Sequence, residues 1–249
     1  KLNIEVKPGK ILDGVGKFVE DKIPVVDDSN QVIDELIKSN AEILVNLLPV
    51  GSEEAVKYDA ECAIKAKVGF INCIPVFIAR DKQWYKKFKD NNVPLIGDDI
   101  KSQVGATIVH RALAQLFSDR GIELKRSYQL NVGGNMDFLN MLEEDRLETK
   151  RTSKTSSVTS VANKGKGMDP DNVRIGPSDY VKWLEDRKKA FIRLEGEAFG
   201  GVPLNIEVQL EVWDSPNSAG VVIDAIRYMK FFTDKKAMPL VGKKLEDAI

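Results

Sequence analysis

The chain has 249 residues, of which 43% are hydrophobic and 30% are charged, and its 37 basic and 38 acidic side chains leave a formal net charge of −1. This length is enough for one large domain or two smaller ones with a sizeable core. The balanced charge excludes a broad basic field, so we expect neither nucleic acid nor an anionic membrane as a main partner.

The cysteines and the apolar runs predict the compartment. Cys62 and Cys73 lie in the apolar contexts AECAIKA and FINCIPV and are predicted to be small buried side chains. Because the sequence has no CxxC pair and no disulfide framework, we expect a cytoplasmic protein. No apolar run approaches the roughly 20 residues that span a bilayer, and no signal peptide is visible. Since the first residue is Lys1 and not Met, we expect a longer polypeptide.

The first hundred residues predict a parallel sheet. Apolar runs alternate with helical patterns in the order 41–48, 52–68, 69–79, 81–92 and 93–99. This is the pattern of parallel strands with crossover helices, and Ser52 is the candidate cap of the first of these helices. Ligands of such sheets bind beyond the carboxyl ends of the strands.

The third of these strands ends in the polar segment IGDDIKSQ, ahead of a helix predicted over residues 102–120. Capping of that helix by the acidic residues is one interpretation. In the other, the helix N-terminal amides and Lys101 bind an anion, and Asp99 binds a hydroxyl or an ammonium group.

Beyond residue 120 the pattern changes to alternating apolar and polar side chains, in the segments 127–134, 171–184, 189–200 and 203–214. Such alternation predicts half-buried antiparallel strands. Residues 215–232 then predict a helix, and residues 163–172 a surface loop. An open α/β part therefore gives way to a mainly antiparallel part.

Lysines supply most of the candidate chemistry. The tight turn GGN and a predicted helix over 137–150 precede Lys150 and Lys154, which are one helical turn apart. Such lysines are ordinarily solvated; beside the hydroxyl groups of TKRTSKTSSVTS, they would instead bind phosphate or transfer protons. Lys188 and Lys189 point to opposite faces of a strand, so at most one of them reaches a shared pocket.

Other polar residues have structural explanations. Asp214 and Ser215 precede the last predicted helix, where capping is the default interpretation. The single histidine, His110, lies within a helix and is predicted to be structural or exposed. Without a Cys/His cluster or a second histidine, neither a zinc site nor a Ser/His/Asp triad is expected. The polar clusters together favour an anionic, hydroxyl-rich small molecule as ligand.

Seven long strings, in order and over nearly the whole chain, resemble the bacterial and archaeal branch of the myo-inositol-1-phosphate synthases: LPVGSEEA, GFINCIPVFIA, VPLIGDDIKSQVGAT, LNVGGNMDFLNMLE, SKTSSVTS, IGPSDYVKWLEDRK and LEVWDSPNSAGVVIDAIR. The resemblance implies an α/β fold with a Rossmann-like parallel sheet, incomplete at the N-terminus. An antiparallel α+β domain for catalysis and tetramer contacts interrupts it. The implied boundaries are 1–101, 102–212 and 213–249.

The resemblance also implies a reaction. The family converts D-glucose 6-phosphate to 1D-myo-inositol 3-phosphate by oxidation of C5 with bound NAD, enolisation, an intramolecular aldol step and reduction by the NADH formed. A homotetramer is implied, and the resemblance allows a divalent or monovalent cation beside the phosphate, near Asp99 and Ser102.

Residue by residue, the resemblance assigns Lys150, Lys154, Lys188 and Asp99 to catalysis. Lys150 would assist proton transfer at the C5 oxygen, and Lys154 and Lys188 would stabilise enolate and phosphate charge. Positions near the nicotinamide are Ser102, Asp137 and Lys150. Asn135 and Asp214 would line the substrate pocket, where Lys101 would contribute a further positive charge.

Two family features are not found in the sequence. The segment GKILDGVGK does not have its glycines in the GxGxxG register of a pyrophosphate-binding loop. The family's C-terminal lysine is not placed within the tail AMPLVGKKLEDAI. Two alternatives therefore stay open: a non-catalytic remnant that binds sugar phosphate or forms oligomers, and an ordinary NAD-dependent dehydrogenase of a polyol phosphate.

Overall fold

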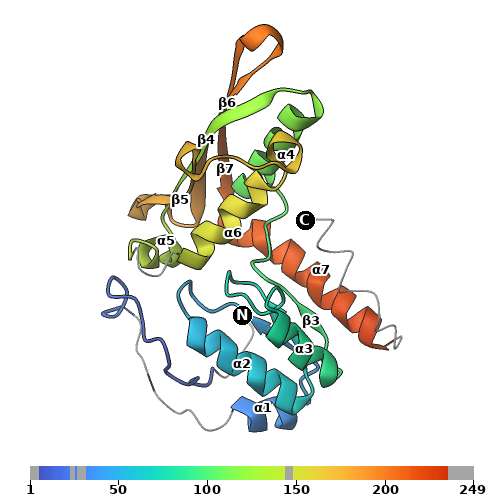
Figure 1. The fold of residues 1–249 in the computed structure, drawn as a ribbon. Helices are drawn as coiled ribbons and strands as arrows, with labels where there is room; N and C mark the ends of the chain where they lie inside the picture. Colours follow the sequence, from blue (N-terminus) through green and yellow to red (C-terminus); the bar gives the residue numbers. More distant parts are fainter. Residues whose placement is uncertain (1–5, 23–25, 27–31, 144–147, 235–249) are drawn as a thin grey trace. The chain divides into compact units, whose positions relative to one another are not determined.

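The computed structural model describes residues 6–22, 26, 32–143 and 148–234, and the side chains of residues 148–151 are outside this description. The described residues form two compact units (Figure 1). The first unit contains residues up to Asp99 together with Ala225 to Asp234, and the second contains Ile100–Asp224. One division therefore falls at the end of the first sheet and the other within the last helix.

The first unit is built on a parallel sheet in the order β1-β2-β3. Its elements are α1 (Val32–Lys38), β1 (Ile43–Asn46), α2 (Glu53–Ala66), β2 (Gly69–Asn72), α3 (Lys82–Asp90) and β3 (Leu95–Ile96). All four residues of β2 are buried, as expected of a central strand covered on both faces. The rings of Phe70 and Phe88 stack in the core with their centroids 6.0 Å apart. The predicted strand–helix alternation is confirmed.

The N-terminus of α2 is capped from a distant part of the chain. Ser52 occupies the N-cap position, as predicted, but its side chain makes no capping hydrogen bond. The Asp13 carboxylate instead accepts hydrogen bonds from Glu54 N, at 2.9 Å, and Ala55 N, at 2.8 Å. A carboxylate is a stronger partner for these amides than a hydroxyl, because it also opposes the positive end of the helix dipole. This contact attaches the segment around Asp13 to the unit.

The second unit contains a four-stranded sheet in the order β5-β4-β6-β7. Its main elements are α4 (Ala106–Asp119), β4 (Glu123–Gly133), α5 (Met136–Asn140), α6 (Glu148–Thr159), β5 (Val173–Tyr180), β6 (Arg187–Glu197) and β7 (Pro203–Trp213), joined by short 3-10 helices η2 (Ala162–Gly165), η3 (Pro170–Asn172), η4 (Lys182–Leu184) and η5 (Phe199–Gly201). The last helix, α7 (Asp214–Asp234), begins in this unit.

Three expectations for this part of the chain need correction. β4 and β5 pair in parallel, so the sheet is mixed and not wholly antiparallel. The long connection through α5 and α6 makes this possible, because parallel neighbours need a crossover and not a hairpin. The helix predicted over 102–120 begins only at Ala106, after the N-cap Gly105. The stretch 137–150, predicted as one helix, contains the short α5 and the start of α6.

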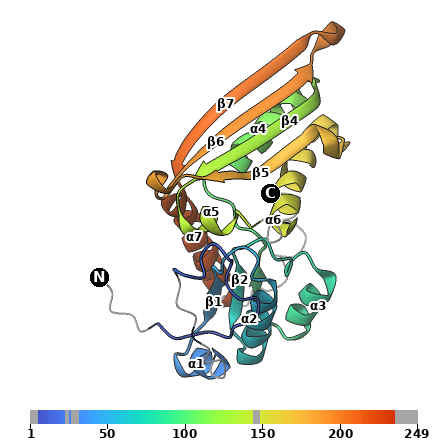
Figure 2. The same ribbon diagram turned by 90° about the vertical axis from the view of Figure 1, so that its left-hand side faces the viewer.

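Helices cover one face of this mixed sheet. Figure 2 shows α4 and α6 on the same side of β4, β5 and β6. The strand residues Ala190, Ile192 and Leu194 pack there with residues of both helices in one core cluster. On the other face, Tyr128 and Phe191 are each 36% exposed. The sheet is therefore buried on one side only, as the alternating sequence predicted. The α/β fold class, with its Rossmann-like parallel sheet, is confirmed.

His110 of α4 lies fully buried within a chain of polar side chains. Asn131 Nδ2 donates to Gly176 O, so its Oδ1 accepts from Gln129 Nε2 at 3.2 Å. The Gln129 Oε1 atom then faces His110 Nδ1 at 3.2 Å, which assigns the ring hydrogen to Nδ1. The other ring nitrogen, Nε2, lies 2.6 Å from the Ser127 hydroxyl. The predicted structural role of this histidine agrees with these contacts.

This histidine is expected to make the protein less stable in acid. Burial lowers the pKa of His110 from 6.5 to about 4, so the folded protein holds the ring neutral. The unfolded chain takes up the proton below about pH 6.5. Stability is therefore lost as the pH falls from about 6.5 to about 4, by up to about 3 kcal/mol from this group. Urea unfolding at several pH values should show a shallower dependence in His110→Gln than in the wild type, and equal slopes would contradict the prediction.

Candidate functional site

The first turn of α7 brings together several of the predicted site residues in the second unit. Asp214 and Ser215 of this turn bond to one segment of the unit, and Asn217 and Ser218 bond to another. Those segments are the loop after Asp99 and the start of β6, with the start of α5 linked through Asn135. Pro216 lies in the same turn, where its missing N–H leaves no intrahelical bond unmade. This turn therefore joins the loop after Asp99 to the start of β6.

Lys188 and Asp214 form an ion pair at the start of α7. Their side chains are only 15% and 18% exposed, so water screens the pair weakly. Lys188 belongs to β6 and lies on the same sheet face as Ala190 and Ile192, the face that α4 and α6 cover. The neighbouring Lys189 pairs with Glu211 at 3.0 Å and is 43% exposed. The sequence prediction that these two lysines point to opposite faces is confirmed.

Asn135 connects the start of α5 to the ion pair. Its Oδ1 accepts a hydrogen bond from Phe138 N at 3.1 Å and so caps α5. Its Nδ2 donates to Asp214 Oδ2 at 3.5 Å and to Asp186 Oδ1 at 3.3 Å. The pocket-lining pair predicted from sequence, Asn135 and Asp214, thus lies together. Asp186 was not singled out as a site residue, because capping and loop aspartates look alike in sequence.

The loop between Asp99 and α4 carries Lys101 and Ser102 to two different helices. Lys101 Nζ donates to Ser153 Oγ of α6 at 3.2 Å, and Ser102 Oγ lies 2.9 Å from Ser218 Oγ of α7. Val104 exchanges hydrogen bonds with the Asn217 side chain through both its N–H and its carbonyl group. The loop is therefore held from two sides, with its ammonium group at the middle of α6 and its hydroxyl group near the start of α7.

Helix α6 presents its predicted lysine beside a buried serine face. Ser153 and Ser157 are buried, and Lys154 follows Ser153 directly and is half-buried. The Ser157 hydroxyl is a buried polar atom with no hydrogen-bond partner in the described structure. Lys150 lies one turn earlier in α6, and its side chain is among those outside the description. Asp137 lies in the first turn of α5 and is half-buried.

The turn Gly133–Gly134 is required by close packing. A Cβ atom on Gly134 would lie 2.5 Å from the carbonyl oxygen of Val181 and would also meet the backbone nitrogen of Glu185. A Cβ atom on Gly133 would enter the ring of Phe138. The two glycines therefore allow β4 to end directly against the segment that leads into β6. The close approach of two backbones, and not a positive φ, explains the choice of glycine.

Gly134→Ala is accordingly expected to lower the free energy of unfolding by about 2–3 kcal/mol, since the backbone atoms that it meets cannot move independently. Gly9→Ala is a suitable control, because nothing lies within 4 Å of a Cβ atom there, and it should change stability by less than about 0.5 kcal/mol. Urea denaturation followed by circular dichroism distinguishes the two. Equal midpoints for both variants would show that the close approach is not present in solution.

In the first unit, polar side chains meet at the carboxyl ends of the three strands. Asn46 Nδ2 donates to Asn72 Oδ1 at 2.8 Å, and Asn72 Nδ2 donates to Asp98 Oδ1 at 2.8 Å. The Asp98 carboxylate also accepts from the amides of Ile78, Ala79 and Arg80. Burial raises the pKa of Asp98, and these hydrogen bonds oppose that shift. This row of side chains holds the loop after β2 against the end of β3.

Asp99, the predicted catalytic aspartate, has a different environment from its neighbour. Its backbone is left-handed, with φ 56°, and its N–H donates to Ile74 O at 3.1 Å. Its side chain is half-buried. Asp99 belongs to the first unit, while the lysines belong to the second. Its catalytic role stays a prediction.

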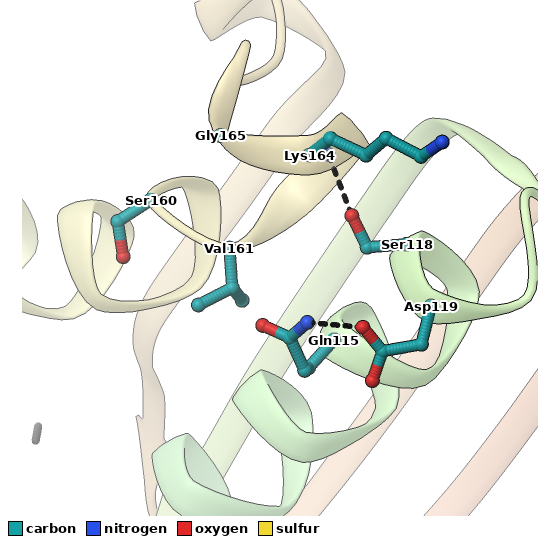
Figure 3. A pocket seen from close by; sticks show the side chains of 7 residues that line it. All are labelled: Gln115, Ser118, Asp119, Ser160, Val161, Lys164 and Gly165. Atoms are coloured by element: carbon teal, nitrogen blue, oxygen red, sulfur yellow. Dashed lines mark hydrogen bonds between the residues drawn. The ribbon is translucent and has the colours of Figure 1, made fainter.

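A surface pocket of about 470 Å³ lies elsewhere in the second unit, between the C-terminal ends of α4 and α6 (Figure 3). Gln115 Nε2 donates to Asp119 Oδ1, and Lys164 N donates to Ser118 Oγ, each at 2.6 Å. Of the residues that the structure describes, none of those predicted for the site lines this pocket. The polar groups of the pocket thus bond to one another.

The described part of the chain contains neither a metal-binding cluster of side chains nor a helix suited to a bilayer. No group of three or more His, Cys, Asp or Glu side chains there is arranged to hold a metal ion. None of the helices in that part combines the length and the apolar character needed to cross a bilayer.

The second unit offers three ammonium groups that differ in their surroundings. Lys188 is held by a carboxylate, Lys101 by a hydroxyl group, and Lys154 lies beside the serine face of α6. Ammonium groups so arranged suit an oxyanion or a phosphate, since each supplies a point charge with up to three donors. Amide and hydroxyl groups from Asn135 and Ser102 add the partners that a polyol needs.

Comparison with known proteins gives a consistent picture. The family model described as myo-inositol-1-phosphate synthase matches residues 105–215. The chain is 59% identical, over 94% of its length, to a protein of Mycolicibacterium smegmatis named inositol-3-phosphate synthase, and 65% of that protein is covered. It is 58% identical, again over 94% of its length, to the inositol-3-phosphate synthase of Mycobacterium tuberculosis, covering 63% of it. The chain therefore spans just under two thirds of the length of these relatives.

A solved structure shows the same fold. The crystal structure of a myo-inositol-1-phosphate synthase-related protein from Thermotoga maritima aligns with 90% of this chain and 66% of its own, with a TM-score of 0.71 at 24% identity. At that identity the comparison concerns the fold alone.

Proposed function

We propose, since this chain belongs to the myo-inositol-1-phosphate synthase family, that the protein containing it converts D-glucose 6-phosphate to 1D-myo-inositol 3-phosphate with catalytic NAD. The single structural observation that supports this reaction best is the shielded Lys188–Asp214 pair with Asn135 beside it. A reaction that passes through enolate and alkoxide charge needs fixed cations in a site poor in water.

We assign the lysines by their positions. Lys188 and Lys154 stabilise the negative charge of the enolate and the phosphate, and Lys101 adds to the field at the phosphate. Lys150 moves the proton at the C5 oxygen. Lys188 lies on the sheet face that α6 covers, and α6 carries the other two catalytic lysines, which supports one shared site. Asp99 is assigned to the same chemistry through its place at a strand end.

The residues present suit a nicotinamide cofactor. Ser102 and Asp137 are half-buried. The Ser102 hydroxyl can donate to the oxygen of a carboxamide, and the Asp137 carboxylate can accept from its NH₂ group. Lys150 is the third residue assigned to this cofactor. When bound, NAD supplies the hydride acceptor for C5 and later returns the hydride. The carboxyl edge of β1, β2 and β3 is the expected place for the rest of the cofactor. Residues 1–101 and 213–249 are assigned to cofactor binding, and residues 102–212 to catalysis.

The oligomeric state and the cellular compartment are part of the same proposal. A homotetramer is supported by the helix-free face of the mixed sheet, where Tyr128 and Phe191 are exposed. The two cysteines form no disulfide in the structure, in line with a cytoplasmic enzyme. A divalent or monovalent cation is proposed as an aid at the phosphate, beside Asp99 and Ser102.

The test is turnover by the full-length protein. With glucose 6-phosphate and NAD, we expect inositol phosphate, identified by phosphorus NMR and by mass spectrometry after dephosphorylation, and no lasting rise in NADH absorbance. NADH formed in a one-to-one ratio with product would instead indicate an ordinary dehydrogenase. Binding of glucose 6-phosphate without product would indicate a non-catalytic remnant.

A further inference from the structure

Asp186 makes more hydrogen bonds than any role assigned to it so far would explain. Its carboxylate accepts from Ser215 N at 3.0 Å, from Ser215 Oγ at 2.7 Å and from Asn135 Nδ2 at 3.3 Å. Its backbone carbonyl accepts from Asp214 N at 2.9 Å. These partners come from the starts of two helices, α5 and α7, while Asp186 itself directly precedes β6.

These bonds surround the ion pair without including it. Asp214 is the partner of Lys188. Its own N–H donates to the backbone carbonyl of Asp186, and the next residue, Ser215, makes two hydrogen bonds to the Asp186 carboxylate. Asn135 is shared between the carboxylates of Asp186 and Asp214. Lys188 follows Asp186 by two residues and is the second residue of β6. The Asp186 carboxylate therefore holds Ser215 and Asn135 on either side of Asp214, and its backbone carbonyl holds the Asp214 N–H. Lys188 is reached through its ion pair with Asp214.

An ordinary helix cap would explain only part of this arrangement. A cap satisfies amides of its own helix, and Asp169 is such a case, since it accepts only from the nearby Asp171 N at 2.9 Å. Asp186 instead connects three segments that are far apart in sequence. Two further residue pairs at the first turn of α7, Ser102 with Ser218 and Val104 with Asn217, make hydrogen bonds that do not reach the Lys188 side. On that side the carboxylate of Asp186 is what holds the turn.

We propose that Asp186 is a positioning residue, which holds Asp214 and Asn135 in the orientation that places the Lys188 ammonium for catalysis. The proposal rests on the proposed function for its catalytic consequence, while its geometric part concerns only the side chains just described. Asp186 contacts neither substrate nor cofactor in this scheme. Its effect on the reaction passes through Lys188.

The geometric part is tested by lysine labelling of the full-length protein. Asp186→Asn keeps the shape of the side chain but replaces one acceptor oxygen by a donor, so the bonds to Ser215 cannot all be made. Competitive acetylation with mass spectrometry should then label Lys188 faster relative to Lys189, by about fivefold, because an ammonium held in an ion pair is shielded from the reagent. Lys189 serves as the internal reference, and Asp169→Asn as the matched control that leaves the ratio unchanged.

The catalytic part is tested by a double-mutant cycle. Asp186→Asn should lower kcat by about 100-fold and change KM by less than about threefold, as expected for a misplaced catalytic group. In a Lys188→Met background the same substitution should lower kcat by less than about threefold more, since its effect depends on Lys188. Asp169→Asn should leave kcat as in the wild type.

The outcomes separate the two proposals. An unchanged Lys188 to Lys189 labelling ratio in folded Asp186→Asn would overturn the positioning role, and so would additive losses in the double-mutant cycle. If the Asn variant does not fold, Ser215→Ala removes a single bond to Asp186, and a rise of about twofold in the same ratio is expected of it. No rise there would likewise overturn the proposal. A wild-type protein that makes no inositol phosphate would refute the proposed function, while the labelling ratio would still decide whether Asp186 positions Lys188.

Discussion

Lys188→Met is expected to lower kcat about 1,000-fold, the loss that follows when one preorganised charge at a developing oxyanion is removed. The reason is the environment of the ammonium group. It is 15% exposed, paired with an equally shielded carboxylate, and lies on the sheet face that the helices cover. Methionine keeps the length of the stem and removes only the charge. The measurement is steady-state production of inositol phosphate by the full-length protein, with folding checked by circular dichroism.

Lys189→Met is the matched control for this experiment. The two lysines are adjacent in β6, but Lys189 pairs with Glu211 on the opposite face and is 43% exposed. Its removal should change kcat by less than about threefold, because exposed ion pairs contribute little. A larger loss in Lys189→Met than in Lys188→Met would mean that the assignment of the catalytic lysine to the helix-covered face is wrong.

Asp98→Asn is expected to lower the free energy of unfolding by about 2–4 kcal/mol, which would make Asp98 the more important of the two adjacent aspartates for stability. Each oxygen of its carboxylate accepts two hydrogen bonds: Oδ1 from Asn72 and Ala79, and Oδ2 from Ile78 and Arg80. An amide of the same shape can place an oxygen at only one of these positions. At the other position its NH₂ group would face two buried donors.

Asp99→Asn tests whether the loss of stability is specific to Asp98. The same substitution there keeps a residue that tolerates the left-handed backbone, which has φ 56° at Asp99. Its free energy of unfolding should stay within about 1 kcal/mol of the wild-type value. Urea unfolding measures both variants. If Asp99→Asn proved the more destabilising, the loop after β2 would have to be held by something other than the Asp98 carboxylate.

Local patterns were sufficient for much of the architecture. The predicted apolar runs at 41–48 and 69–79 end before Pro49 and Arg80, and each contains a parallel strand, β1 and β2. Alternation along β7 placed Ile206, Val208 and Leu210 on the core-facing side, as predicted. Such patterns succeed because the period of a strand or helix alone determines which side chains share a face. The same reasoning placed Lys188 and Lys189 on opposite faces.

The prediction was weaker wherever partners come from far along the chain. The parallel pairing of β4 with β5 has no local sign in either strand, since alternation looks the same for both directions of pairing. The side-chain hydrogen bonds at the start of α2 come from Asp13, about 40 residues before the helix, and not from the N-cap residue Ser52. Asp186 looked like one more polar residue near a strand end.

What the sequence by itself determined about this protein is the α/β class, the order of its elements, the family resemblance and the residue types of the candidate site. Those follow from the short-range periodicity of apolar side chains and from long strings of residues, and both are properties of the linear sequence. Only the tertiary structure decided that Asp214 is the partner of Lys188, that Asp186 holds both Ser215 and Asn135, and that Asp98 holds the loop after β2. These contacts join residues 18 to 51 positions apart, and a hydrogen bond or an ion pair depends on distances that only the folded chain establishes.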